Sequence, residues 1–185
     1  MKDPNNLVVS LNVDYWDYLG WRDTLAKPEY TARQQEYAST RGDGRVYTPQ
    51  MVMNGLDHAV GSSRNAVNSK IEEARNVGLG VPLKLAITDK EIKVEIGAKA
   101  IDGEATLWLM AIEPEVQQKI LRGENSGTTV TYHNVVRNLI PAAMWKGEAY
   151  KGSWMRDTVM TKNCKLCIAV LQMGKAGQVL GLAQA

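Results

Sequence analysis

The fold of the first part of this chain is decided by ten residues, Val46-Tyr47-Thr48-Pro49-Gln50-Met51-Val52-Met53-Asn54-Gly55. A Thr-Pro step leads directly into a short apolar run, and Asn-Gly follows that run. Asn-Gly favours a type I′ turn between two antiparallel strands, because both residue types tolerate a positive φ. The stretch therefore predicts a strand over residues 50–53, a tight turn, and a second strand over residues 58–60.

A strand and two helices are expected around this hairpin. Residues 7–13 are mostly apolar and β-branched, which is typical of a strand buried on both faces. A helix follows, beginning at residues 23–24 or, because proline suits only a first helical turn, nearer Lys27, and it ends at Gly42. After the hairpin, Ser62 or Ser63 can cap a second helix, whose apolar face comprises Ala66, Val67, Ile71 and Ala74.

The resulting order of strand, helix, strand, strand and helix is that of a thioredoxin-like domain without its first strand and helix. In such domains an X-Pro loop with a cis proline faces a Cys-x-x-Cys at the start of an earlier helix. We therefore expect a cis peptide bond between Thr48 and Pro49, although such bonds are only ~5–6% of X-Pro bonds in general. No cysteine precedes Cys164, so the chain carries one wall of a redox site and lacks the other.

After residue 79 the periodicity changes to short alternating runs that are separated by turn residues. About seven strands are expected, at residues 83–88, 92–96, 105–112, 128–139, 142–148, 167–172 and 179–182. Strands at such spacing predict an antiparallel sandwich. The predicted fold class is thus α/β plus all-β, with an incomplete thioredoxin-like domain over residues 1–79 and an antiparallel β-sandwich over residues 80–185.

Three stretches together resemble a known family. They are residues 12–21 (NVDYWDYLGW), residues 46–52 (VYTPQMV), and residues 122–125 (RGEN) with residues 131–137 (TYHNVVR). They are similar to a bacterial family of secreted, thioredoxin-like proteins, domain of unknown function 1223. The resemblance covers nearly the whole chain. It implies a thioredoxin-like domain followed by a β-sandwich, in a periplasmic or secreted protein of unestablished activity.

The departure from that family lies at the front. Its members open with a strand leading into a Cys-x-x-Cys-Pro segment, ahead of the equivalent of Leu7, where this sequence has only six residues. No position matches a catalytic cysteine, so none is carried over. We expect a catalytically incomplete module. Whether the chain is an enzyme stays open, and the expectation for the sequence as given is that it is not. The polar residues 1–6 also contain no signal peptide.

Composition limits the partners. The chain has 185 residues, with 22 Lys and Arg against 20 Asp and Glu, for a net charge of +2. This balance gives no concentrated basic face for nucleic acid. No apolar run approaches the ~20 residues of a membrane span. No dinucleotide or phosphate-binding glycine motif occurs, and the two histidines are far apart in the sequence, so no cofactor or metal is expected.

Two loops hold the candidate binding residues. One follows the first predicted strand and offers carboxylates and rings, Asp14, Trp16 and Asp17. The other is Tyr47-Thr48-Pro49, where the backbone of Thr48 would pair with an extended peptide or protein ligand. The carboxylates and rings could hold a cationic or peptidic ligand. The alternative is that the rings pack beneath the loop, the carboxylates cap it, and the proline serves shape alone.

Cys164 and Cys167 form a Cys-x-x-Cys, but in an unsuitable context for catalysis. Reactive pairs lie at a helix N-terminus, where the helix dipole lowers the thiol pKa. Here Cys167 begins an apolar run that predicts a strand. Residues i and i+3 of a regular strand lie ~10 Å apart, so a disulfide requires a turn at residues 163–166. Two free thiols, a structural disulfide and a redox-active pair all remain open.

Three functions are compatible with these features. The first is a thioredoxin-like protein of unknown role, catalytically incomplete in this chain. The second is an extracytoplasmic thiol-disulfide oxidoreductase whose active cysteines lie upstream. The third is a non-enzymatic module that binds peptides or proteins. Because the strand missing from the predicted sheet would leave unpaired edges at residues 7–13 and 50–53, we also expect a homo-oligomer.

Overall fold

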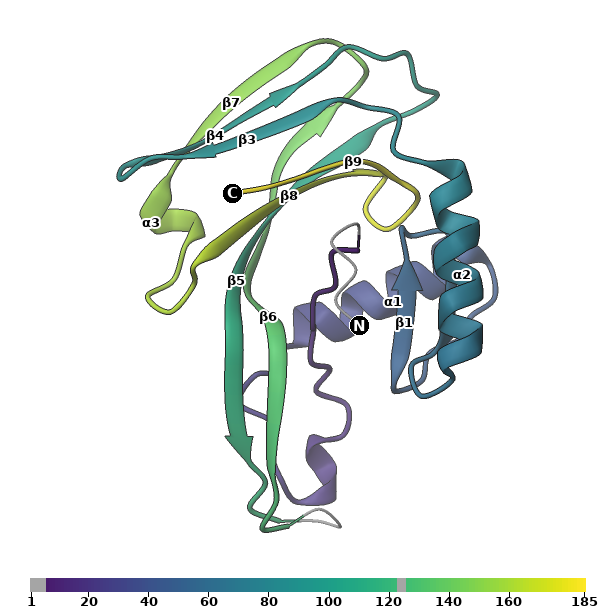
Figure 1. Cartoon of the computed structure of the whole chain (residues 1–185), viewed down its shortest axis with the longest axis vertical. Helices are drawn as coiled ribbons and strands as arrows, with labels where there is room; N and C mark the ends of the chain where they lie inside the picture. Colours follow the sequence, from purple (N-terminus) through teal and green to yellow (C-terminus); the bar gives the residue numbers. More distant parts are fainter. Residues whose placement is uncertain (1–5, 123–125) are drawn as a thin grey trace.

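The computed structural model describes residues 6–122 and 126–185. Within this part the chain is mixed α/β, with three antiparallel sheets and few helices (Figure 1). Residues 123–125, which belong to the third stretch of family resemblance, lie outside the described residues.

Two of the three sheets form a sandwich. One has the strand order β3 (Leu83–Ile87), β4 (Glu91–Ile96) and β7 (Tyr150–Met155). The other has the order β6 (Thr129–Trp145), β5 (Ala105–Lys119), β8 (Leu166–Met173) and β9 (Val179–Gln184). Fully buried side chains of both sheets meet in the main core, among them Ile92, Val94, Leu107, Leu109 and Leu171. The predicted antiparallel strands over residues 80–185 are therefore present.

Two of the predicted strands are wrong in detail. Residues 128–139 and 142–148 were expected as separate strands, but β6 runs from Thr129 through Pro141 to Trp145 without a break. Pro141 has no N–H to donate and would interrupt a central strand. Yet β6 is an edge strand that pairs only with β5, so a proline is tolerated there. Conversely, β7 was not predicted, because its alternating half-buried residues include Gly152, which weakens the strand signal.

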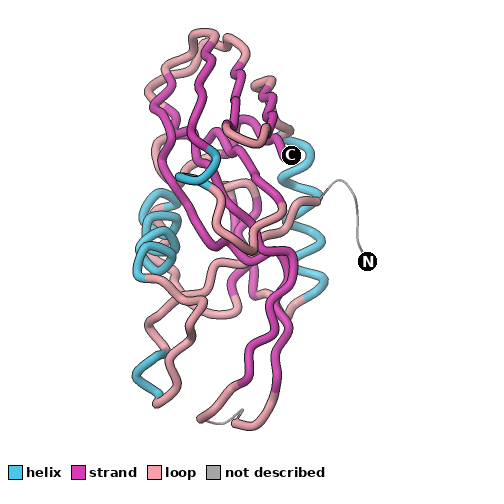
Figure 2. The backbone as a smooth tube through the Cα atoms, turned by 90° about the vertical axis from the view of Figure 1, so that its left-hand side faces the viewer, coloured by secondary structure: helices cyan, strands magenta, loops and turns pink. Residues whose placement is uncertain are grey.

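The long strands β5 and β6 extend beyond the sandwich as a two-stranded ribbon. β8 pairs with β5 only between Thr106 and Ile112, whereas β6 stays paired with β5 as far as Lys119. Figure 2 shows these two strands continuing together away from the rest of the sheet. A short 3-10 helix, η1 (Asp17–Leu19), lies in the loop region beside this end of the molecule (Figure 1).

The hairpin and both flanking helices form as predicted. α1 spans Pro28–Arg41, with proline in its first turn and Gly42 left-handed at its end. β1 (Gln50–Met53) pairs with β2 (Asp57–Val60), and the turn residues Asn54 and Gly55 have φ values of 48° and 71°. α2 spans Arg64–Val77 after Ser63. Its side chains Val67, Ile71 and Ala74 pack with the hairpin, whereas Ala66 is exposed.

The predicted strand over residues 7–13 does not form. This segment is extended but has a single bridge, between Ser10 and Val135 of β6, in parallel orientation. The Ser10 N–H donates to the Asn134 carbonyl at 2.9 Å, and the Val136 N–H donates to the Ser10 carbonyl at 3.0 Å. Beyond this bridge, the side chain of Asn134 in β6 donates a hydrogen bond to the Val8 carbonyl at 2.9 Å, but among the described residues no ladder of backbone hydrogen bonds follows. Its apolar side chains, Leu7, Val9 and Leu11, pack on the outer face of the sandwich.

The two parts of the chain share a core. Tyr30 of α1 is buried together with Met110, Ile112, Val136 and Ile168 of the four-stranded sheet. In addition, the carbonyl of Asn54 in the β1–β2 turn accepts a hydrogen bond from the Val179 N–H at 2.8 Å. The division at residues 79 and 80 stays a prediction, and any such domains are packed closely against each other.

Candidate functional site

The two predicted binding loops meet in the structure. The indole Nε1–H of Trp16 donates a hydrogen bond to Thr48 Oγ1 at 2.9 Å, across 32 positions of sequence. The Thr48–Pro49 peptide bond is cis, and the Pro49 carbonyl accepts a hydrogen bond from the Gly61 N–H at 2.8 Å. The first loop is thereby joined to the residues that lead into β1. Trp16, Thr48 and Pro49 belong to one exposed region of the molecule.

Exposed apolar side chains gather on these two loops. Trp16 is 46% exposed, Tyr18 76%, Leu19 59% and Val46 39%. The rings of Trp16 and Tyr18 are stacked, with centroids 6.4 Å apart. The ring of Tyr15 also contacts Trp16, in a tilted arrangement with centroids 5.4 Å apart. We call Trp16, Tyr18, Leu19 and Val46 the aromatic surface. Such a concentration of apolar area is typical of an interaction site rather than of scattered surface residues.

The two carboxylates of the first loop face inward, toward the loop itself. Asp14 Oδ1 accepts a hydrogen bond from Thr31 Oγ1 of α1 at 2.5 Å. Asp17 Oδ1 accepts one from the Asp23 N–H at 3.1 Å, and its second oxygen lies 4.0 Å from Arg22. Asp14 therefore ties the loop to α1, and Asp17 closes the loop on residues 22 and 23. The prediction that they would hold a cationic ligand gains no support from these contacts.

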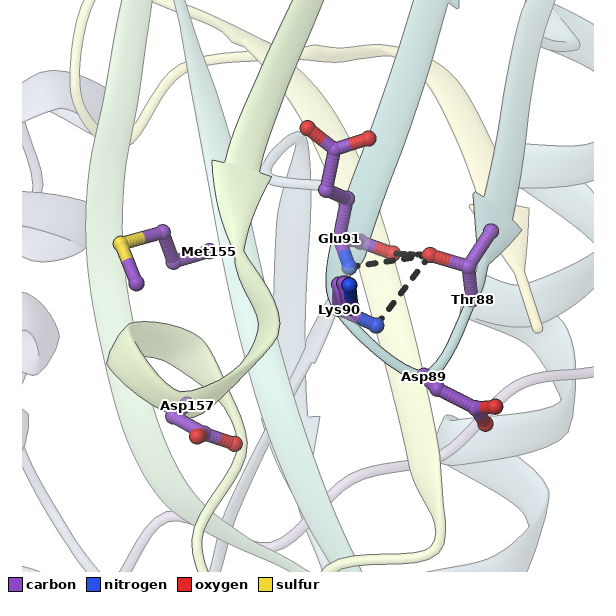
Figure 3. Close-up of a pocket in the computed structure, with 6 residues that line it drawn as sticks. All are labelled: Thr88, Asp89, Lys90, Glu91, Met155 and Asp157. Atoms are coloured by element: carbon purple, nitrogen blue, oxygen red, sulfur yellow. Dashed lines mark hydrogen bonds between the residues drawn. The ribbon is translucent and has the colours of Figure 1, made fainter.

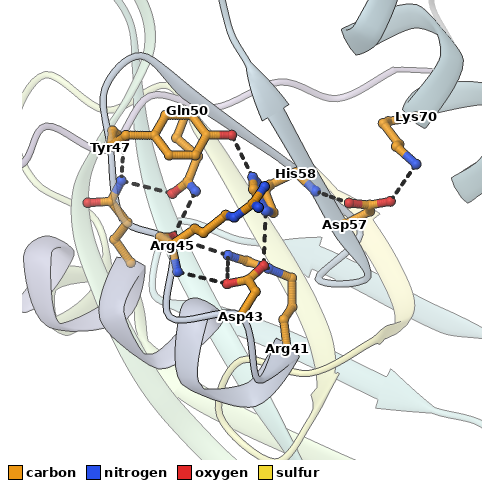
Figure 4. Close-up of polar contacts among 9 residues, drawn as sticks. Arg41, Asp43, Arg45, Tyr47, Gln50, Asp57, His58 and Lys70 are labelled. Carbon is orange, nitrogen blue, oxygen red and sulfur yellow. Dashed lines mark hydrogen bonds and ion pairs between the residues drawn. The ribbon is translucent and has the colours of Figure 1, made fainter.

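Tyr47 is fixed at both ends. Its carbonyl accepts a hydrogen bond from Gln34 Nε2 of α1 at 2.8 Å. Its hydroxyl lies 2.5 Å from His58 Nδ1 of β2, and His58 Nε2 lies 3.0 Å from Asp43 Oδ2 (Figure 4). We call Tyr47, His58, Asp43 and Arg41 the Tyr47 chain. It reaches from the loop before β1 to the end of α1.

The charge on Asp43 determines which groups donate and which accept hydrogen bonds along the Tyr47 chain. Its carboxylate accepts hydrogen bonds from Arg41 Nε at 3.0 Å and from the Arg45 N–H at 2.9 Å. The hydrogen bond from Arg41 is the largest cause, and the Arg45 N–H the second, of an Asp43 pKa well below its usual range. Asp43 is thus an acceptor only, so the Nε2 of His58 carries the proton that points to it.

His58 and Asp43 were not predicted as members of the site. His58 was considered only as a metal ligand. The predicted hairpin already placed His58 beside β1, close to the Thr-Pro step, and this could have linked it to Tyr47. Asp43 carried no comparable signal, because its position depends on how residues 42–46 fold back over β2.

The two cysteines lie in the protein core, unlike the exposed residues of the two loops. Both are buried in the main core of the sandwich and both are free thiols. The Thr161 hydroxyl lies 3.0 Å from Cys164 Sγ, and Cys167 is the second residue of β8. Burial, followed by the neighbouring Cys164, raises the pKa of the Cys167 thiol from 9.0 to about 11. A thiol with such a pKa is a poor nucleophile at neutral pH.

A shallow hollow of about 630 Å³ lies at the other end of the molecule, lined by Thr88, Asp89, Lys90, Glu91, Met155 and Asp157 (Figure 3). Thr88 Oγ1 accepts hydrogen bonds from the N–H groups of Lys90 and Glu91 and donates one to the Glu91 carbonyl. These contacts close the β3–β4 turn.

Two further properties were tested over residues 6–122 and 126–185. Nowhere in them do three or more His, Cys, Asp or Glu side chains gather closely enough to hold a metal ion. In the same part of the chain, no helix has the length and apolar character needed to cross a membrane.

Comparisons with known proteins found a solved structure and a family model that match the chain. The structure is similar to the X-ray crystal structure of protein AGR_C_4864 from Agrobacterium tumefaciens, a structural genomics target. The TM-score is 0.77 at 26% sequence identity, over 95% of this chain and 78% of that one. No curated protein matches the chain. Residues 1–172 match the family model described as "Protein of unknown function (DUF1223)". The chain therefore belongs to the DUF1223 family.

Proposed function

We propose that the first part of the chain is a thioredoxin-like module whose aromatic surface binds an extended peptide segment of another protein. The observation that carries this proposal is the hydrogen bond between Trp16 and Thr48. It joins two loops that are distant in sequence into one exposed surface of rings and aliphatic side chains. The order of α1, β1, β2 and α2, with the Thr-Pro step before β1, supports the thioredoxin-like assignment.

The chemistry of this surface favours a neutral, apolar peptide over a charged one. Aromatic side chains supply large contact area at a small entropic cost and are enriched at protein interfaces. Asp14 and Asp17 are occupied by contacts within their own loop, and Asp43 is paired with Arg41. These carboxylates thus already have hydrogen-bond partners within the chain. Apolar side chains of a ligand would therefore provide most of its affinity.

Thiol-disulfide exchange is not assigned to the described residues. Their two cysteines are buried in the sandwich, away from the aromatic surface, and the raised pKa of Cys167 disfavours its thiolate. We further propose an extracytoplasmic location, which rests on the family resemblance alone. An insulin-reduction assay on this chain is expected to show no turnover, and turnover that is lost in Cys164→Ser would contradict this part of the proposal.

A displayed library of unstructured peptides, selected against this chain, tests the binding proposal. Selected peptides should be rich in apolar residues, and the double variant Trp16→Ala/Tyr18→Ala should weaken their binding about tenfold or more, which corresponds to about 1.4 kcal/mol. Met155→Ala is the matched control, because Met155 is 69% exposed but lies on β7. Equal affinity of the double variant and the wild type would refute the proposal.

A further inference from the structure

We infer that His58 is the positioning residue of the peptide site, and that it acts by holding Tyr47 and thereby Thr48 in place. This inference rests on the proposed function, since the site it positions is the aromatic surface. The ring nitrogens of His58 are engaged by Tyr47 on one side and by Asp43 on the other (Figure 4).

The hydrogen-bonding roles along the Tyr47 chain follow from the charge at its far end. The Asp43 carboxylate accepts from His58 Nε2–H, so in the neutral imidazole Nδ1 carries the lone pair. The Tyr47 hydroxyl therefore donates its proton to Nδ1. Since Arg41 holds the carboxylate ionised, the imidazole is kept in one tautomer and one orientation.

Two side chains of the Tyr47 chain are largely withdrawn from water, whereas Asp43 is exposed. The side chain of His58 is only 10% exposed and that of Arg41 only 7%. Arg41 Nη1 is buried with no hydrogen-bond partner, so the guanidinium is held for its contacts with Asp43 and the Arg45 carbonyl. The hydrogen bond between Tyr47 and His58 is partly buried and is therefore stronger than one at an exposed position, whereas the bonds to Asp43 are exposed. The chain is thus suited to fix a loop.

What the chain fixes is the residue next to the contact that joins the two loops. Tyr47 is held by His58 at its hydroxyl and by Gln34 at its carbonyl. Thr48 follows directly and accepts the hydrogen bond of the Trp16 indole. Loss of the His58 contact would free the Tyr47 side chain. Thr48 would then be held by the Gln34 bond to the Tyr47 carbonyl before it and by the Gly61 bond to the Pro49 carbonyl after it, without the side-chain anchor, and Trp16 would loosen. His58 thereby controls the aromatic surface without belonging to it.

The indole N–H of Trp16 gives a direct test in the free protein. The chain has five tryptophans, and each gives one indole signal in a ¹H–¹⁵N NMR spectrum. The Trp16 signal is identified with the variant Trp16→Phe. In His58→Leu and Tyr47→Phe this signal should shift and exchange faster with solvent, while the other four stay in place. An unchanged Trp16 signal in both variants would overturn the inference.

Peptide affinity gives the second measurement. For a peptide selected on the wild type, His58→Leu should weaken binding about tenfold, a change typical of a lost interface contact. His58→Asn places an amide oxygen near the position of Nδ1, so it should accept the Tyr47 hydroxyl and restore most of the affinity. Tyr150→Phe in β7 is the control for loss of a tyrosine hydroxyl elsewhere. A folded His58→Leu protein that binds with unchanged affinity would contradict the inference.

The two proposals fail in different ways. If the wild type selects no peptide, the proposed function is wrong, and the NMR comparison still decides whether His58 positions Trp16. If the wild type binds peptide and neither the Trp16 signal nor the affinity responds to His58→Leu, only the positioning role is wrong.

Discussion

Arg33 is a buried cation whose contacts are all with neutral groups. It is 5% exposed, and its Nη2 donates to Gln172 Oε1 at 2.6 Å and to the Tyr37 hydroxyl at 3.1 Å. Its Nη1 donates to the Lys175 carbonyl, and its guanidinium carbon lies 4.6 Å from the Trp108 ring centroid. Desolvation of a charge is costly unless its hydrogen bonds are made. Arg33 therefore joins α1 to β8 through several contacts at once.

We predict that Arg33→Ala lowers the free energy of unfolding by about 2–4 kcal/mol, because it leaves the buried Gln172 carbonyl without its donor and removes packing on Trp108. Urea denaturation measures the change. Arg22→Ala is the control, since the Arg22 side chain is 89% exposed and its one ion pair spans 4.0 Å. The control should stay within about 0.5 kcal/mol of the wild type. A similarly small loss in Arg33→Ala would show that its contacts contribute little.

The two cysteines should be unreactive in the folded protein. Cys164 is 6% exposed and Cys167 is fully buried, and burial raises the pKa of the Cys167 thiol to about 11. A thiol-specific colorimetric reagent at pH 8 is therefore expected to modify neither residue until denaturant is added, and then to modify both. Two thiols that stay unmodified in denaturant without reductant would instead indicate a disulfide between them. Rapid modification of the native protein would contradict the observed burial.

At the scale of elements, the β1–β2 turn is in close contact with the β8–β9 connection. Gly55 has a φ of 71°, and a Cβ placed on it would lie 1.9 Å from the Gly177 carbonyl oxygen. The neighbouring Asn54 carbonyl accepts the Val179 N–H. A glycine is thus needed here for two reasons, the left-handed backbone and the close approach of a second backbone.

Gly55→Ala should consequently be much more destabilising than an alanine at a glycine that has a positive φ but no close neighbour. Gly42→Ala offers that comparison, because Gly42 has a φ of 77° with nothing within 4 Å of an added Cβ. We expect a loss of about 1–2 kcal/mol in Gly42→Ala from the left-handed conformation. A larger loss is expected in Gly55→Ala, measured by thermal unfolding of both variants. Equal losses would mean that the turn moves away from Gly177 without cost.

At the scale of the whole molecule, the predicted division at residues 79 and 80 cuts through shared contacts. Tyr30 donates a hydrogen bond to the Val136 carbonyl at 2.8 Å inside the second core, and Arg33 bonds to Gln172. Calorimetry is therefore expected to show one unfolding transition, with equal calorimetric and van't Hoff enthalpies. Two resolved transitions would mean that residues 1–79 and 80–185 unfold independently.

Self-association is the second prediction at this scale. Among the described residues β1 has β2 as its strand partner, and its other edge, which includes the backbone groups of Val52, pairs with no strand. The segment of residues 7–13 bridges to β6 only at Ser10. Unpaired strand edges recruit further strands. Light scattering over a dilution series should therefore show a species larger than one chain, and a monomer at every concentration would contradict the prediction.

Local signals in the sequence were sufficient for the short-range features. The Asn54-Gly55 turn, the start of α1 at Pro28 and its end at Gly42 depend on backbone preferences of single residues, and all three form. The DUF1223 family was likewise identified from contiguous stretches, and the match over residues 1–172 confirms it. These features need no knowledge of what packs against them.

Features that depend on distant partners required the tertiary structure. β6 continues through Pro141 because it is an edge strand of its sheet. Residues 7–13 form no strand because they make a single bridge to β6. The Tyr47 chain was likewise hidden, because Asp43 and His58 are 15 positions apart and meet only when the loop after α1 folds over β2. A hydrogen bond between such residues is set by packing and burial, which no local pattern records. Preferences of single residues were enough to predict the Asn54-Gly55 turn, α1 and α2, whereas the pairing of strand edges and the contact of Trp16 with Thr48 depend on the packing of distant segments.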